Sequence, residues 1–284
     1  MLERPRGYWP DVFHRFRRES IAWLAAAVVA AFVLAAVAAP RIAPYSPLKT
    51  ALLERLRPPS AAHWLGQDEV GRDILSRVIF GGRVSLAVGV LSVALGVGVG
   101  GLLGIVAGFY RRLDDPIMRV VDIVMAFPFI LRAIAVVAIL GPGFINLFIA
   151  IGFGQIPTFA RLVRSLVLGV KGETFVEAAR AIGADDRRVL SHHVLPQMVA
   201  PITTYSTLEM GAAILGAATL SFLGLGVNPP TPEWGALASA GREHLRYAPH
   251  VVVFPSLAIF IAVWAFNVLG DALRDAMDPK LRGR

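Results

Sequence analysis

The stretch Glu177-Ala178-Ala179-Arg180-Ala181-Ile182-Gly183, followed by His193-Val194-Leu195-Pro196, decides how this chain folds. It is polar and lies between two long apolar runs, where packed helices usually need a connection of roughly 2–8 residues. We therefore predict a built structural element at about residues 167–197, called the insert below.

The composition places the chain in a membrane. Of the 284 residues, 56% are hydrophobic and 17% are charged, whereas roughly 25% of the residues of a soluble domain are charged. A membrane helix needs about 20 apolar residues. Six runs meet this length, near residues 21–39, 83–109, 117–140, 144–166, 198–225 and 250–270. We expect an all-α integral membrane protein with six transmembrane helices, which excludes a soluble enzyme.

The distribution of Lys and Arg predicts the orientation. Segments 1–20, 110–119, 161–198 and 271–284 hold 18 of the 28 basic residues, whereas segments 40–80 and 226–249 hold 8. Basic residues gather on the cytoplasmic side of a membrane, so both termini and the insert are predicted to be cytoplasmic. Residues 1–82 would then hold a cytoplasmic segment, the first membrane helix and an outer loop. Residues 83–284 would form a five-helix core, with the insert between helices 4 and 5 of the six.

The first apolar run imitates a secretory signal peptide. A basic leader precedes the apolar stretch 21–33, and Ala36-Val37-Ala38 resembles a cleavage site. The leader is long and the apolar run continues to Ala39, so we expect an uncleaved membrane anchor.

Several kinds of site are not expected. The chain has no Cys, which removes disulfides and thiolate chemistry. Its net charge of +8 comes without a basic stripe interleaved with aromatic residues, so nucleic acid is not an expected partner. His192 and His193 would point about 100° apart on a helix, unlike ligands that share an ion at i and i+4, so no metal site is expected. The Gly-x-x-x-x-Gly-Lys-Ser/Thr phosphate loop is missing.

Glycines in the second apolar run predict close packing of helices. Gly96, Gly98 and Gly101 match Gly-x-Gly-x-x-Gly, but dinucleotide binding needs that string between a strand and a helix. A different spacing, one glycine every four residues, places small residues on one helix face, where a second helix can approach closely. The residues with this spacing are Gly96, Gly100, Gly104 and Gly108.

The insert reads as two short helices around a glycine. Thr174 and Glu177 have the spacing of a capping box, and Gly183 suits the left-handed conformation that ends a helix. Asp185 or Asp186 can cap the second helix. Pro196 would lie in the first turns of the fifth membrane helix, where a missing backbone donor costs least.

Proline- and glycine-rich segments flank the other membrane runs. They include APYSP at 43–47, HWLGQDEVGRDILSR at 63–77, SFLGLGVNPPTPEWG at 221–235 and FNVLGDALRDAMDP at 266–279. Trp64 and Trp234 are interpreted as membrane-interface anchors; the family resemblance given below implies contact with an external partner as the alternative. Arg72 and Asp73 are predicted to hold their loop by a local ion pair, with contact to a partner as the alternative.

These motifs together resemble one family. Glu-Ala-Ala, three residues, Gly, nine residues and x-x-Leu-Pro is similar to the loop by which permeases of ABC importers engage their ATPases. The flanking segments resemble the second, C-type permease subunit of dipeptide/oligopeptide/nickel importers, from about residue 15 to the end.

The resemblance implies a function and partners. The insert would dock on an ATPase subunit. The expected partners are a sister permease that is a different chain, two ATPase subunits carrying ATP and Mg, an extracytoplasmic substrate-binding protein and the lipid bilayer. The chain itself would bind no cofactor and would not be an enzyme. The coupling residues implied are Thr174, Glu177, Ala178, Ala179, Arg180, Gly183, His193, Leu195 and Pro196.

The resemblance also implies a location and a substrate class. The chain would be a multi-pass protein of a bacterial or archaeal cytoplasmic (inner) membrane. Its expected substrate is a di- or oligopeptide, taken up by ATP-driven alternating access. Permeases of the same kind for nickel, glutathione or oligosaccharides are the alternatives.

Two charges within the apolar runs are candidates for the substrate pathway. Arg132 and Glu209 are each costly in lipid, by about 2.5–3.5 kcal/mol at mid-helix. They could pair with each other, contact a second subunit, or line a watery path and meet the termini of a peptide. An ion-coupled secondary transporter with Glu209 as proton carrier, or a structural membrane scaffold, are rival hypotheses. The transporter hypothesis gives the insert no task, and the scaffold hypothesis predicts no substrate-dependent activity.

Overall fold

The computed structural model describes residues 19–277 of the chain. Within this range the protein is helical, without strands, apart from an isolated bridge between Gln67 and Asp73. The prediction of an all-α protein is confirmed. The α-helices are α2 (Ser20–Ile42), α3 (Ile74–Leu95), α4 (Gly101–Phe109), α5 (Arg111–Met125), α6 (Phe129–Leu140), α7 (Phe144–Lys171), α8 (Thr174–Ala181), α9 (Asp186–Arg188), α10 (Leu195–Phe222), α11 (Trp234–Ala240) and α12 (His250–Met277).

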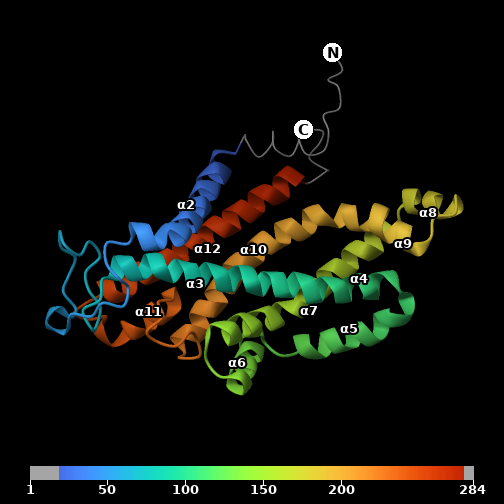
Figure 1. The fold of residues 1–284 in the computed structure, drawn as a ribbon. Helices are drawn as coiled ribbons and strands as arrows, with labels where there is room; N and C mark the ends of the chain where they lie inside the picture. The colour runs from blue at the N-terminus through green and yellow to red at the C-terminus, as the bar shows by residue number, and fades with distance from the viewer. Residues whose placement is uncertain (1–18, 278–284) are drawn as a thin grey trace, which may run out of the picture.

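The helices form an elongated bundle (Figure 1). α3 continues through a π-helical turn, Gly96–Gly100, into α4, and this rod runs along the bundle with α7, α10 and α12. α8 and α9 lie at one end, while α11 and the connection between α2 and α3 lie at the other. The insert and this first connection, residues 43–73, are therefore at opposite ends, as the predicted topology requires.

Length and apolarity identify the helices that could cross a membrane. Among the described residues these are Ser20–Ile42, the rod Ile74–Phe109, Phe144–Lys171 and His250–Met277, with the bent pair α5 and α6 as a further candidate. α10 has 28 residues but is not among these candidates. Its Thr203, Thr207 and Thr219 hydroxyls donate to carbonyls four residues earlier, which satisfies these donors without water. A sixth span through α10, and the orientation, stay predictions.

The expected single helix over residues 117–140 is wrong. α5 ends at Met125, α6 begins at Phe129, and the two helices are bent by 89°. Pro128 has no backbone N–H, and a proline disfavours the helical conformation of the residue before it, here Phe127. The run is apolar on both sides of the break, so its composition did not indicate that the helix is interrupted.

The second membrane helix begins earlier than the apolar run indicated, at Ile74 rather than Arg83. The Asp73 carboxylate caps it by accepting the backbone N–H of Ser76 at 2.8 Å. This cap satisfies a donor that a helix start otherwise leaves free. α3 therefore runs through the boundary that the sequence placed between residues 82 and 83.

Trp234 is not an interface anchor in this chain. It is 1% exposed, and its indole Nε1 donates to the carbonyl of Val78 at 2.9 Å. Gly81 and Gly82 provide its space, since a Cβ at either glycine would lie 3.1 Å from the indole. Trp234 thus packs α11 onto α3. Trp64, by contrast, is 70% exposed, so both interpretations of that residue stay open.

The glycine ridge packs the rod against α7, as the sequence predicted. A Cβ at Gly100 would lie 2.4 Å from the carbonyl oxygen of Ile156, and one at Gly104 would lie 2.5 Å from that of Ala160. A Cβ at Gly108 would lie 2.7 Å from the Cβ of Val167. These distances are below any normal contact, so the two backbones approach as closely as they do because the glycines lack side chains.

We expect Gly104→Ala to destabilise the protein, because the methyl group forces α4 away from α7, at a cost of about 1–3 kcal/mol for overpacking. Gly98→Ala is the matched control, because a Cβ at Gly98 meets nothing within 4 Å. Thermal unfolding of both variants in mild detergent measures the difference. Equal midpoints would contradict the role of the ridge.

Candidate coupling surface and membrane charges

The insert is built onto the helix ends by a small core of its own. Val176 of α8 and Val189 after α9 are buried together with residues of the rod, α7 and α10. Burial of these side chains makes the insert part of the bundle rather than a loose loop. The buried residues of this core are Phe109, Val163, Val167, Val176, Val189, Val194 and Met198.

The predicted capping box at the start of α8 is not formed. The N-cap is Glu173, and no side chain caps the helix; Thr174 is its first residue. Glu177 is exposed and follows in the first turn, where a carboxylate favours the positive end of the helix dipole. The spacing of Thr174 and Glu177 correctly predicted that a helix begins here, but the predicted capping hydrogen bonds are not formed.

The turn between α8 and α9 has the predicted geometry. Gly183 has φ +95°, the left-handed region that favours glycine. The Asp185 carboxylate accepts the backbone N–H of Arg188 at 2.9 Å, so it caps α9. Arg180 reaches across the turn to Asp186 with 3.1 Å between Nη2 and Oδ1. The turn is therefore held by its own side chains.

The Glu-Ala-Ala stretch has two faces. Ala179 is buried, as is Val176, whereas Ala178 is exposed. Phe175 and Ile182 are also exposed, and Ile182 is 88% accessible. Positions 175, 178 and 182 follow the i, i+3, i+7 spacing of one helix face. They form an outward apolar stripe of Phe175, Ala178 and Ile182, called the α8 stripe below.

Polar contacts fasten the base of the insert to the rod. Lys171 Nζ donates to the carbonyl oxygen of Phe109 at 2.6 Å. The Lys171 ammonium and the Arg180 guanidinium also lie 5.3 and 6.0 Å from the centre of the Phe109 ring, within the range of cation–π attraction. The insert, α4 and the end of α7 are thereby joined at one aromatic side chain.

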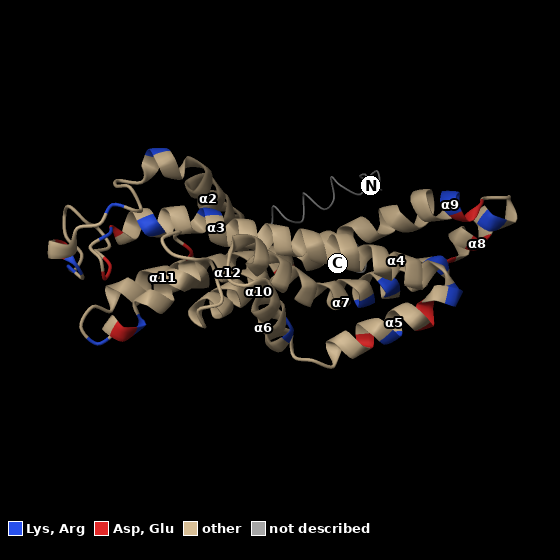
Figure 2. Cartoon of the chain, turned by 60° about the horizontal axis from the view of Figure 1, so that its bottom comes forward, with Lys and Arg blue, Asp and Glu red and all other residues tan. Residues whose placement is uncertain are grey.

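Ion pairs fasten α5 to α7 next to this base. Arg164 pairs with Asp114 through two hydrogen bonds, one of them 2.7 Å between Nη2 and Oδ2. Arg161 pairs with Asp122 at 2.6 Å. Figure 2 shows the charged residues gathered at the two ends of the molecule and along α5.

The remaining predicted coupling residues follow α9. His193 is half-buried, with its ring centre 6.2 Å from that of Phe175. Leu195 is exposed, and Pro196 lies in the first turn of α10, as predicted. A π-helical turn, Val189–Val194, joins α9 to α10. The neighbouring His192 contacts Ser191, and the described residues hold no cluster suited to a metal ion.

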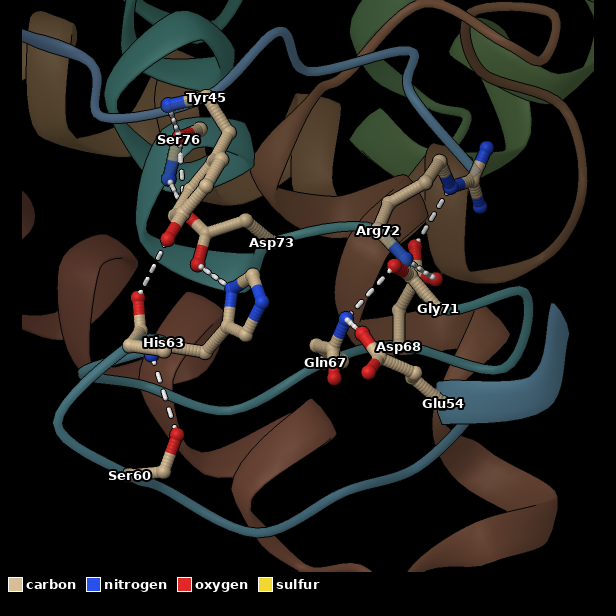
Figure 3. Close-up of polar contacts among 11 residues, drawn as sticks. Tyr45, Glu54, Ser60, His63, Gln67, Asp68, Gly71, Arg72, Asp73 and Ser76 are labelled. Carbon is tan, nitrogen blue, oxygen red and sulfur yellow. Dashed lines mark hydrogen bonds and ion pairs between the residues drawn. The ribbon is translucent and has the colours of Figure 1, made fainter. Parts of the chain in front are cut away.

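The first connection, at the opposite end, is organised by two polar groups that Figure 3 shows side by side. In one group, the buried Asp68 forms an ion pair with Arg72, with 2.7 Å between Asp68 Oδ2 and Arg72 Nε. Arg72 also pairs with Glu69, with 2.9 Å between Nη2 and Oε1. Arg77 lies 3.4 Å from the same Asp68 carboxylate. The predicted pair of Arg72 with Asp73 is therefore wrong in its partner, although the loop is held by ion pairs as expected.

In the second group, Asp73 is the shared acceptor. Its carboxylate lies 2.9 Å from His63 Nδ1 and accepts the Ser76 hydroxyl at 2.7 Å. The Ser76 oxygen in turn accepts the backbone N–H of Tyr45 at 3.0 Å. Residues from both ends of the connection are thus tied to the start of α3.

Arg132 and Glu209 form no ion pair with each other in the described structure. The Glu209 carboxylate accepts Gln155 Nε2 at 3.0 Å and is also hydrogen-bonded to Tyr205. Arg132 Nε and Nη1 are buried, and neither has a hydrogen-bond partner among the described residues. Sequence reasoning marked both charges but missed Gln155, a buried amide within an apolar run.

Comparison with known proteins now assigns the family. Residues 100–283 match the family described as "Binding-protein-dependent transport system inner membrane component", and residues 7–59 match the "N-terminal TM domain of oligopeptide transport permease C". The chain is an ABC importer permease. It belongs to the dipeptide/oligopeptide/nickel family as a C-type subunit, which is a non-catalytic membrane component.

Named relatives cover nearly the whole permease. It is 49% identical over 283 residues to the glutathione transport system permease protein GsiD of Escherichia coli O157:H7, covering 99% of this chain and 93% of the relative. Identity to GsiD of Shigella dysenteriae serotype 1 is 50% over the same coverage. The prediction of a multi-pass inner-membrane permease is confirmed.

Solved structures support the fold of the permease. A chain of the MetNI methionine ABC transporter, in inward-facing conformations, matches 71% of this chain and 97% of its own length, with 19% identity and a TM-score of 0.59. A chain of an amino acid ABC transporter crystallised with histidines matches 69% of this chain and 91% of its own length, with 16% identity and a TM-score of 0.53. These likenesses concern the fold alone.

The permease should depend strongly on Asp68. Asp68→Asn leaves Arg72 and Arg77 without their shared, buried counter-charge, which costs about 3–5 kcal/mol for a broken buried pair. Glu54→Gln is the control, because the Glu54–Arg57 pair is exposed and such pairs contribute about 0–1 kcal/mol. Thermal unfolding in detergent should separate the two variants. Similar midpoints would show that the Asp68 network does not hold the first connection.

Proposed function

We propose that this permease moves short peptides inward by ATP-driven alternating access and that its insert is the surface on which an ATPase subunit acts. The observation that carries the proposal is the two-sided α8. One side is buried in the core shared with the rod, α7 and α10, and the other presents the exposed α8 stripe. A helix with both features can receive a partner and pass on its movement.

The mechanism follows from how the insert is attached. ATP binding closes the ATPase pair, and this displaces any surface that is docked on it. Because Val176 and Val189 pack with Met198 and Val163, α8 cannot move without the ends of α7 and α10. The displacement then passes to the membrane helices as a rigid-body movement. Repeated closure and reopening would expose the pathway to alternate sides.

A short peptide is the substrate class that the relatives favour. GsiD is named for glutathione transport, and glutathione is itself a tripeptide. The family match at residues 7–59 names an oligopeptide permease. Nickel and oligosaccharides are the alternative outcomes of an uptake test.

The partners belong to the same proposal. A permease of this kind works with a second permease subunit, two ATPase subunits that hold ATP and Mg, and an external substrate-binding protein. The insert would then face the cytoplasm, and the first connection would face the binding protein. The relatives from Escherichia and Shigella support a bacterial inner membrane.

We expect Ile182→Asp to uncouple the permease from its ATPases. The new carboxylate would have to be buried, unpaired, in an apolar contact, which costs several kcal/mol. Affinity purification of the tagged chain from mild detergent should recover the sister permease but lose the ATPase subunits, and ATP-dependent uptake should fall. Glu177→Arg should act in the same direction, by reversing an exposed charge beside the α8 stripe.

Leu53→Asp is the matched control for this experiment. Leu53 is 98% exposed, like Ile182, but lies in the first connection at the opposite end of the bundle. Its substitution should leave the ATPases bound. Retention of the ATPases by Ile182→Asp and Glu177→Arg alike would refute the coupling surface, and a wild-type chain that purifies alone would favour a secondary transporter.

A further inference from the structure

An ion pair lies at membrane depth on the outside of the bundle. α7 has 28 residues, so it is about 42 Å long, which matches the full thickness of a bilayer with its headgroups, about 40–45 Å. Arg161 is ten residues before the end of α7 at Lys171, or about 15 Å from that end. The headgroup layer takes up only about 5–7 Å on each side. The level of Arg161 is therefore within the hydrocarbon layer.

Both partners of this pair are exposed. Arg161 Nη2 lies 2.6 Å from Asp122 Oδ1 of α5, and the two side chains are 52% and 58% exposed. A charged side chain at the centre of a membrane helix costs about 2.5–3.5 kcal/mol in lipid. Charges at this depth face the interior of an assembly or a water-filled path instead. The surface that carries the pair is therefore not covered by lipid.

The same surface continues along α5 as a row of charged side chains. Positions 112, 115, 119 and 122 fall on one side of a helix with about 3.6 residues per turn, and all four side chains are exposed. They are Arg112, Asp115, Arg119 and Asp122, called the α5 charged strip below. Figure 2 shows charges of both signs along α5, which lies at the outside of the bundle. The opposite side of α5 packs against α4 and α7, where Val121 is buried.

An apolar row lies next to the charged strip. Each charged residue is followed directly by an exposed apolar one, namely Leu113, Pro116, Val120 and Ile123. A step of one residue turns about 100° around a helix, so the two rows lie at the same depth but face different directions. Val120 is 61% exposed and Ile123 is 64% exposed. One helix thus presents a polar and an apolar surface side by side.

The balance of charge on the strip favours water over lipid headgroups as its surroundings. Anionic headgroups attract clusters of Lys and Arg. The strip holds two Arg and two Asp residues, so its net charge is zero. A row of alternating signs is well solvated by water and offers no cluster of one sign to a headgroup.

We infer that the α5 charged strip lines the inner, water-filled part of the transport pathway. The inference rests on the proposed function and adds to it the surface along which the substrate leaves the permease. Because the strip has both signs and no net charge, it hydrates the exit without retaining a substrate of either sign. The apolar row is the part of α5 that stays out of water.

The test uses cysteine labelling, for which this chain is suited because it contains no Cys. Arg119→Cys and the matched control Val120→Cys are made separately in the complete importer, in lipid nanodiscs that leave both membrane faces open. Labelling of this chain by a sulfonated, membrane-impermeant maleimide is followed over time. Arg119→Cys should react at least about tenfold faster than Val120→Cys, because the reactive thiolate is disfavoured outside water. Asp115→Cys provides a second position on the strip and should also react fast.

Trapping the ATPase subunits with ATP and vanadate should slow the labelling of Arg119→Cys, because alternating access closes the inner end of the pathway. Equal rates for Arg119→Cys and Val120→Cys would overturn the inference. A fast rate that trapping leaves unchanged, with the ATPases still bound, would also overturn it, since the strip would then be a permanently wet surface. Absence of the ATPases from the purified wild type would refute the proposed function and the inference with it, and a gel of the complex shows this before any labelling.

Discussion

The close contact of the α3–α4 rod with α7 is the constraint on which the rest of the structure depends. Gly100 and Gly104 let the two backbones meet without intervening side chains. Since the insert follows directly from α7 and shares a core with Phe109 of α4, the spacing of these helices sets the position of α8. The bond from Lys171 to the Phe109 carbonyl completes this junction. The packing of the membrane helices therefore also determines where the insert lies.

The contacts of the charged side chains differ between the two ends of the protein and the region between them. In the first connection, the buried carboxylates of Asp68 and Asp73 each contact several donor groups of neighbouring residues. These contacts hold the long connection in a fixed conformation. Beside the insert, α5 is joined to α7 by paired Arg and Asp residues. Between these ends, charge is expensive to bury, and Glu209 is accordingly hydrogen-bonded. Arg132 departs from this pattern, because its buried Nε and Nη1 have no hydrogen-bond partner among residues 19–277.

Rigidity at both ends suits a subunit that transmits movement. A loop that yielded under load would absorb the displacement of a partner instead of passing it on. The α8–α9 turn is braced by Gly183, the Asp185 cap and the Arg180–Asp186 pair. The break at Pro128 provides a change of direction within the bundle without lengthening a loop. The Phe129 ring, which packs against Gly154 of α7 and Gly216 of α10, fixes that direction.

The sequence by itself determined the elements whose signals are local. The Gly183 turn and the glycine spacing depend on neighbouring residues and agree with the structure, and the family motifs agree with the family match. Apolar length identified the helical class, but it missed the break between α5 and α6 and the early start of α3. Tertiary structure alone decided which residues meet. Trp234 and Ala179 are buried, whereas Ile182 is exposed. Arg72 pairs with Asp68 rather than with Asp73, and the Glu209 carboxylate accepts a hydrogen bond from Gln155. The physical reason is that burial and pairing depend on which helices come together in space, and the order of residues along a single helix does not specify that.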